Sequence, residues 1–127
     1  MFRINSSTKQ ININRGDVGN LKVTATYEDG TAYTFQIGDV VRFGIFANGN
    51  YNDIILEKDV TVQAETSYVV VPLTAQNTTI GDIINSPVSY YYEVQLNPDT
   101  DPHTIVGHDE NGPKIFMLYP EGAKQEW

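Results

Sequence analysis

Carboxylates and histidines are the side chains in this sequence with the strongest potential for catalysis or metal binding. Glycosidases use two carboxyl groups that face each other across the bond being broken, and the spacing singles out no such pair. His103 and His108 lie on either end of an expected strand, which places them on opposite faces with no evident third ligand for a shared zinc ion. We therefore predict neither a catalytic residue nor a metal site. The carboxylates considered are Glu57, Asp59, Glu65, Glu93, Asp99 and Asp101.

Two polar loops carry oxygen ligands at alternating positions, a spacing that calcium sites use. Neither loop continues to the bidentate glutamate of an EF-hand, so hairpin turns are the simpler interpretation. The sequence leaves open whether a calcium ion or a glycan binds in these loops. The residues concerned are Asn48, Asn50, Asn52 and Asp53 in one loop, and Asp109 and Asn111 in the other.

Other signatures of enzymes are missing from the sequence. It contains no cysteine, which excludes disulfides, thiolate metal sites and a cysteine nucleophile. It also contains no nucleophile elbow, phosphate-binding loop or dinucleotide fingerprint. We therefore expect a protein that is not an enzyme and needs no cofactor.

Charge and hydropathy narrow the classes of partner. Sixteen acidic and eight basic residues among 127 give a formal charge of −8, which repels nucleic-acid backbones and anionic lipid heads. The first residues, "MFRINSSTKQ", lack the apolar centre of a signal peptide, and no segment approaches the roughly 18 apolar residues of a membrane span. We expect no nucleic-acid or membrane partner, and a chain made and folded in a cytoplasm.

Short runs that alternate apolar and polar residues dominate the chain and predict an all-β fold. One domain is expected over residues 1–127, with a polar tail at 121–127. The architecture is expected to be an antiparallel β-sandwich (Ig-like) or an open barrel. At most one short helical turn is expected, where Thr74 could cap a turn before Gly81. The expected strands are 9–15, 20–28, 32–37, 39–46, 52–60, 67–73, 88–96, 103–108 and 113–120.

The phase of the alternation predicts which side chains face the core. Residues 20–28 and 32–37 are expected to form a hairpin around the Asp29-Gly30 turn, and residues 39–46 a third strand. In the run "YYY", Tyr90 and Tyr92 are expected on one face and Tyr91 on the other. The remaining inward residues are Leu21, Val23, Ala25, Tyr27, Tyr33, Phe35, Ile37, Val41, Phe43 and Ile45.

The pair Gly-Asp occurs twice, each time just before an alternating run, as Gly16-Asp17 and Gly38-Asp39. Glycine adopts positive φ at little cost, and aspartate can accept hydrogen bonds from the backbone of the same turn. We interpret both pairs as turns that lead into strands, and we expect turns at Gly30 and Gly112 as well. Arg15-Gly16-Asp17 also spells the integrin-binding tripeptide, but its place between two strands argues against presentation on a loop.

Exposed aromatic residues are the candidates for an interface. Tyr91 is expected to face away from the core, Tyr51 lies beside a predicted turn, and Trp127 ends an otherwise polar tail. We therefore name Tyr51, Tyr91 and Trp127 as interface candidates.

Three segments in order carry a family resemblance: "INRGDVGNLKVTATYEDGTAYTFQIGDVVRFGIF", "VPLTAQNTTIGD" and "YYYEVQLNPDTDPHTIVGHDENGPKIFMLYPEG". The shared features are the two Gly-Asp turns, the Asp29-Gly30 hairpin, the Leu73-Thr74 segment, the tyrosine-rich strand and a final hairpin that closes in Pro120-Glu121-Gly122. The chain resembles small β-domains that phages and prophages of Gram-positive bacteria encode among their tail and baseplate genes. It is similar to the N-terminal domain of baseplate upper proteins.

The resemblance implies a non-enzymatic structural protein of the virion, which assembles with other tail or baseplate proteins and with copies of itself in a ring. Baseplate upper proteins continue past this domain into a helical region that binds the receptor-binding protein. Since this sequence stops at Trp127, we expect an adaptor or accessory domain. The alternative is a carbohydrate- or cell-surface-binding β-sandwich module, which would expose aromatic rings such as those of Tyr51, Tyr91 and Trp127.

Overall fold

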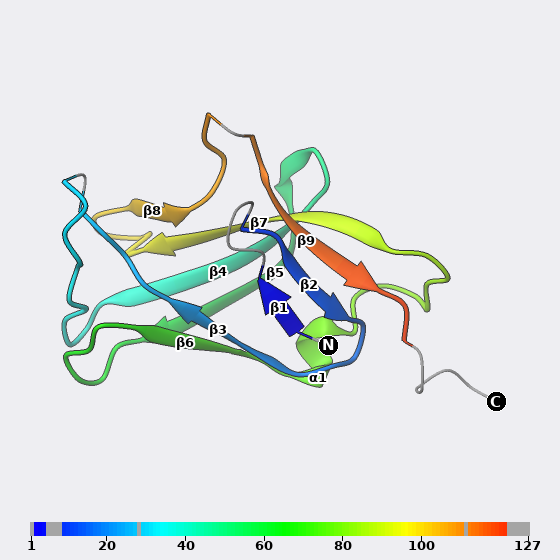
Figure 1. Cartoon of the computed structure of the whole chain (residues 1–127), viewed down its shortest axis with the longest axis horizontal. Coiled ribbons are helices and arrows are strands. Elements are labelled where there is room, and N and C mark those ends of the chain that lie inside the picture. Colours follow the sequence, from blue (N-terminus) through cyan, green and yellow to red (C-terminus); the bar gives the residue numbers. More distant parts are fainter. Residues whose placement is uncertain (1, 5–8, 28, 111, 122–127) are drawn as a thin grey trace.

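The computed structural model describes residues 2–4, 9–27, 29–110 and 112–121. These residues form strands and one short helix, as expected for an all-β fold (Figure 1). No helix in the described ranges is long and apolar enough to cross a membrane. The elements are β1 (Phe2–Ile4), β2 (Ile11–Asn14), β3 (Gly19–Val23), β4 (Val40–Ala47), β5 (Asn50–Thr61), β6 (Val69–Leu73), α1 (Ala75–Thr78), β7 (Val88–Leu96), β8 (His103–Val106) and β9 (Lys114–Tyr119).

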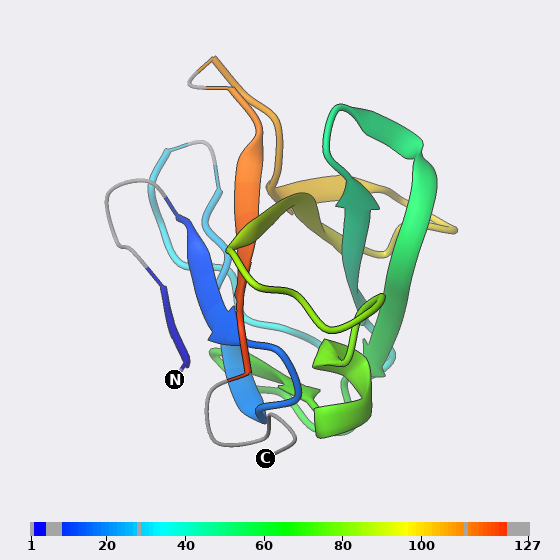
Figure 2. The same cartoon turned by 90° about the vertical axis from the view of Figure 1, so that its right-hand side faces the viewer.

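Two sheets enclose one hydrophobic core. The larger has seven strands in the order β1-β2-β9-β7-β4-β5, with β8 also paired to β7, and the smaller consists of β3 and β6. In Figure 2 the larger sheet is seen with β1 and β5 at opposite sides of the molecule. Side chains from both sheets meet between them, so the architecture is sandwich-like. The core includes Ile11, Ile13, Leu21, Val23, Val41, Phe43, Ile45, Val71, Leu73, Val94, Phe116 and Leu118.

Most expected strands are confirmed, and β7 begins and ends where the alternation does. Tyr92 is buried in the core, and Tyr90 packs against it, as predicted. The helical turn is also confirmed: the Thr74 hydroxyl accepts a hydrogen bond from the Asn77 N–H, and the Asn77 side chain accepts one from the Thr74 N–H. This reciprocal cap satisfies two donors at the start of α1, which has only four residues.

The predicted hairpin over residues 20–37 forms only in part. The Asp29-Gly30 turn is present, with the Gly30 N–H donating to the Tyr27 carbonyl, but beyond β3 pairing is reduced to isolated bridges. Tyr27 is 56% exposed and Ile37 is 75% exposed, so neither enters the core as expected, whereas Phe35 is fully buried. The pairing of β3 with β6 stops at Val23, and a two-stranded arm without a third neighbour gains little stability in water.

Two features of the larger sheet differ from the expected antiparallel arrangement. β2 runs parallel to β9, and the short strand β1 pairs with β2 at one edge. Parallel neighbours need a long connection between them, and nearly the whole chain lies between β2 and β9. Local alternation carries no information about strand direction, which explains why the sequence did not reveal this pair.

Both Gly-Asp pairs occupy turns with positive φ, as predicted: φ is 85° at Gly16 and 92° at Gly38. Gly30 and Gly112 also have positive φ, at 89° and 93°. At the first pair, the Asp17 N–H donates to the Asn14 carbonyl, and the Asp17 carbonyl accepts from the Thr78 hydroxyl. The two turns therefore share a positive φ at their glycines.

At the second pair, the Asp39 carboxylate joins three segments. It accepts hydrogen bonds from the Gln36 N–H at 2.9 Å, the Tyr33 hydroxyl at 2.7 Å and the Asn97 amide at 3.1 Å. Burial disfavours its charge, but these three donors outweigh burial and hold the pKa of Asp39 below its ordinary value. Asn97 also accepts from the Val40 N–H. The turn thereby fixes the start of β4 against the end of β7.

Replacing Gly38 with Val tests the backbone account of this turn. No atom lies within 4 Å of a Cβ added at Gly38, so the cost arises from positive φ rather than from a clash. We expect the free energy of unfolding to fall by about 1–3 kcal/mol, measured by urea denaturation. Thr61→Val, which places the same side chain at an exposed strand position, is the control and should change stability little. Equal stability of the Gly38→Val and Thr61→Val variants would contradict the explanation by positive φ at Gly38.

Candidate functional site

The outer face of the larger sheet, opposite the core, is set by strand β4. Val41 and Phe43 are fully buried and Ile45 nearly so. Because neighbouring side chains on a strand point to opposite faces, Arg42, Gly44 and Phe46 lie on the outer face.

Strand register places two rows of side chains across this face. Arg42 is paired with Asp59 on β5 and with Gln95 on β7. Gly44 is paired with Glu57 on β5 and with Glu93 on β7. The Phe46 ring covers Gly44, since a Cβ added at this glycine would lie 2.9 Å from Phe46 Cζ. Beside it is a hollow of about 160 Å³, lined by Arg42, Gly44, Phe46, Glu57, Glu93 and Gln95.

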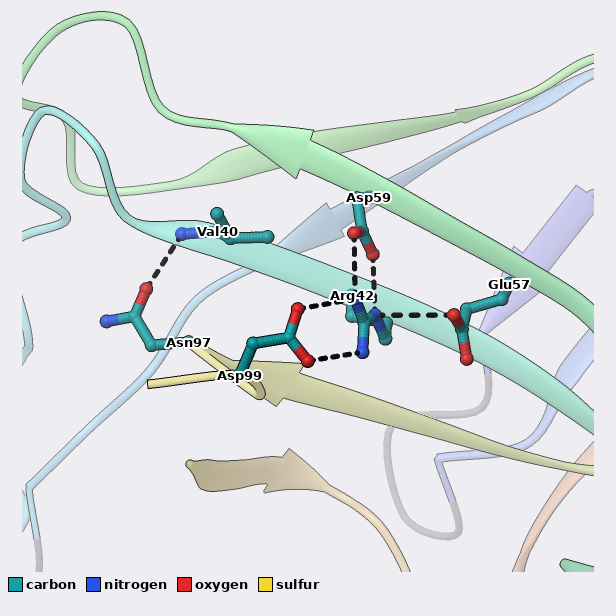
Figure 3. Close-up of polar contacts among 6 residues, drawn as sticks. All are labelled: Val40, Arg42, Glu57, Asp59, Asn97 and Asp99. Carbon is teal, nitrogen blue, oxygen red and sulfur yellow. Dashed lines mark hydrogen bonds and ion pairs between the residues drawn. The ribbon is translucent and has the colours of Figure 1, made fainter. Parts of the chain in front are cut away.

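Arg42 is held by carboxylates on both sides (Figure 3). Its Nε and Nη2 donate to the two carboxylate oxygens of Asp59 at 2.8 and 3.0 Å. Its Nη1 and Nη2 donate to Asp99 at 3.3 and 3.0 Å, and Nε lies 3.7 Å from Glu57 Oε1. The hydrogen bonds from Arg42 hold the pKa of Asp59 below its ordinary value. The guanidinium is thus fixed in place, and its charge is more than balanced by its neighbours.

Glu93 lies on the other side of the hollow in a different environment. Its side chain is half-buried, and burial raises the pKa of Glu93 above its ordinary value. Within the described part of the chain, no hydrogen bond or ion pair reaches its carboxylate. Glu93 therefore carries a charge that its surroundings do not compensate.

Aromatic rings close the end of the hollow at Phe46. The Tyr51 ring centroid lies 5.2 Å from that of Phe46 and 5.4 Å from that of Tyr91, and the His108 ring lies 6.2 Å from Tyr51. The Tyr51 hydroxyl is buried and has no hydrogen-bond partner among the residues that the structure describes. Its pKa is raised by burial, and further by the nearby charge of Glu93.

The structure thus brings together two of the three interface candidates, Tyr51 and Tyr91, and the third, Trp127, lies outside the described residues. Both tyrosines are half-buried against each other and against Phe46. The exposed tyrosines are Tyr27 and Tyr68, at 56% and 44%. Tyr51 and Tyr91 therefore form part of a packed cluster.

The carboxylates considered from sequence fall into two groups. Glu57, Asp59, Glu93 and Asp99 gather around Arg42 and Gly44. Asp101 lies 3.3 Å from His103 Nε2, and Glu65 lies in the connection between β5 and β6. The ring of His108 contacts that of Tyr51. In the described ranges, no group of three or more His, Cys, Asp or Glu side chains could hold a metal ion.

The two loops with oxygen ligands are hairpin turns in the structure. Asn48 donates to the Ser89 hydroxyl at 2.7 Å, and Asn50 accepts from the Asn52 N–H at 3.0 Å. In the second loop, Lys114 Nζ lies 2.8 Å from Asp109 Oδ1, and Asn111 lies outside the described residues. The carboxylate of Asp109 in the second loop is therefore already paired with Lys114 of the same chain.

The integrin-type tripeptide is not presented to solvent. The Arg15 side chain is buried, donates to the carbonyl oxygens of Ile80 and Gly81, and forms an ion pair with Glu121. Arg15 therefore ties β2 to the segment that follows α1 and to the end of β9.

A larger open hollow of about 1000 Å³ lies between residues 24–33 and β8. Its acidic side chain, Asp29, already accepts two hydrogen bonds from Thr31. Its aromatic side chains, Tyr27 and Tyr33, pack edge to face at 5.6 Å between centroids. The smaller hollow over Gly44 is the stronger candidate site, because Glu93 is the carboxylate without a partner among the described residues that line the two hollows.

Comparison of the chain with protein-family models, with curated proteins and with solved structures finds no match.

The environment of Glu93 predicts a specific pH dependence of stability. A carboxyl whose folded pKa lies above its unfolded value of about 4.3 makes folding less favourable as pH rises through the interval between the two. We expect Glu93→Gln to raise the melting temperature at pH 7 and to leave it nearly unchanged at pH 3. Glu57→Gln, on the opposite side of Gly44, is the control and should give no increase, because Glu57 lies near Arg42. A lower melting temperature for Glu93→Gln at pH 7 would contradict this account.

Proposed function

We propose that this protein is a non-enzymatic structural protein of a phage or prophage virion, which assembles with other tail or baseplate proteins. The order of turns and strands that resembles small tail domains supports this proposal, and so does the sandwich-like fold. The observation that carries the proposal is the open edge at β5.

β5 is the longest strand and the outermost on its side of the sheet. Its strand neighbour among the described residues is β4, so one side of β5 offers unpaired backbone groups. An unpaired edge is a template for a strand of another chain. Register shifts opposite residues 50–54 accompany exposed Ile54 and Ile55, at 53% and 37%. Apolar side chains beside an open edge favour a protein contact there.

The alternative, a carbohydrate-binding module, receives less support from the arrangement of the tyrosines. Stacking of a sugar needs a free aromatic face, whereas Tyr51 and Tyr91 pack on each other and on Phe46. Partly buried aromatic residues beside an open strand are instead typical of protein interfaces. We also propose that several copies of the chain assemble into a ring within the virion.

Particles released after prophage induction provide the test. We expect peptides of this chain in purified particles at a constant ratio to the other tail proteins, measured by quantitative mass spectrometry. The double variant Ile54→Lys, Ile55→Lys, introduced into the prophage, should remain folded but be lost from particles, because charge on the edge opposes strand pairing.

Ile37→Lys is the matched control, since Ile37 is 75% exposed and lies outside the strands. It should be incorporated normally. Absence of wild-type peptides from particles that form normally would overturn the proposed function. Normal incorporation of the double variant would overturn the role of β5.

A further inference from the structure

We infer that the hollow over Gly44 receives the side chain of an arginine from a partner protein. The inference rests on the proposed function, because it identifies the chemistry of the partner surface that meets the outer face. Its basis is the register, charge and size of the hollow.

The register places Gly44, which is covered by the Phe46 ring, between two carboxylates. Glu57 and Glu93 flank Gly44 from the strands on either side. Neighbouring strands are about 4.8 Å apart, so the backbones that carry these two residues are about 10 Å apart. A planar guanidinium between them can donate hydrogen bonds in both directions.

The charge of the site favours a cation. Three carboxylates, those of Glu57, Asp59 and Asp99, lie around the Arg42 guanidinium, and a fourth, that of Glu93, lines the same hollow. The Arg42 guanidinium donates hydrogen bonds to Asp59 and Asp99 (Figure 3). Among the described residues it forms no ion pair with the carboxylate of Glu93. A positive group entering from a partner would compensate the charge that the site leaves unpaired.

The rings complete a site suited to arginine. A Cβ placed on Gly44 would lie 2.9 Å from Phe46 Cζ, which shows that the Phe46 ring reaches over the glycine. A cation within about 6 Å of an aromatic centroid is attracted to the ring face, and guanidinium groups stack on such faces more readily than ammonium groups do. Tyr51 packs on Phe46 and supports the ring from behind the hollow's lining residues.

The size of the hollow argues for one side chain. Pockets for free small molecules usually measure about 300–1,000 Å³, whereas this hollow measures about 160 Å³. It is also continuous with the proposed assembly edge, because Phe46 is paired with Ile54 of β5. An arginine inserted here would act as the polar anchor of an interface whose apolar part lies at Ile54 and Ile55.

Titration of the isotope-labelled full chain by NMR tests the inference. The probe is N-acetyl-arginine amide, and the control probe is N-acetyl-citrulline amide, which has a similar shape but no charge. We expect arginine to shift the backbone amide signals of Gly44, Phe46 and Glu93 in a saturable manner, and citrulline to leave them unchanged.

Variants identify the carboxylate responsible. Glu93→Gln should weaken arginine binding about fivefold or more, and Glu65→Gln, the same change at an exposed position in the β5–β6 connection, should not. Binding should also weaken at low pH, since protonation removes the charge of Glu93. The other charged or titratable groups around the hollow are Glu57, Asp59, Asp99, Arg42 and His108.

Three outcomes would overturn the inference: equal shifts with citrulline and arginine, equal binding by the Glu93→Gln and Glu65→Gln variants, or shifts of the same amides by N-acetylglucosamine but not by arginine. The last outcome would identify a glycan site instead. Failure of arginine binding while the chain is still found in particles would reject the inference and leave the proposed function standing.

Discussion

The outer face of this protein depends on the burial of alternate side chains of β4. Val41, Phe43 and Ile45 fill the core between the two sheets, and a shift of β4 by one residue would bring Arg42 into that core. Because the cost of burying an unpaired guanidinium is so high, the register is fixed. Once it is fixed, Gly44 must lie between Glu57 and Glu93, and Phe46 must lie beside Tyr91.

The turn before β4 reinforces this register. Asp39 binds the Gln36 N–H and the Tyr33 hydroxyl, and the hydrogen bond to Asp39 raises the pKa of Tyr33 to about 12. Asn97 connects the same carboxylate with the Val40 N–H. These hydrogen bonds connect Val40, the first residue of β4, to Asn97, the residue that follows β7. They thereby align two of the strands that form the candidate site.

Local patterns in the sequence predicted most of the strands, whereas the pairing and direction of the strands depend on contacts between distant residues. The alternation of residues 88–96 was enough to place Tyr92 inside and Tyr91 outside, and a threonine before a short polar run was enough to locate α1. The same alternation gave a wrong prediction for Tyr27 and Ile37, because among the described residues the segment that follows β3 is paired only by isolated bridges. The parallel pairing of β2 and β9 depends on residues at opposite ends of the chain.

For the candidate site, the sequence identified Tyr51 and Tyr91 but gave no reason to connect them with Gly44, Arg42 or Glu93. Period-two alternation could have placed Arg42, Gly44 and Phe46 on one face. Their partners on β5 could not be assigned, because the β4–β5 hairpin contains register shifts that move every pairing near its tip. The lining of the hollow combines a glycine covered by the Phe46 ring with two glutamates whose positions are set by separate strand pairings.

The central claim is that this chain assembles through β5 and the adjoining outer face. Hydrogen exchange measured by mass spectrometry, on the free chain and on the chain within purified particles, tests it most directly. The account predicts slower exchange in particles for peptides that cover β5, Asn50–Thr61, because their free edge becomes paired or covered. Exchange of those peptides at the same rate in particles and in the free chain would contradict it.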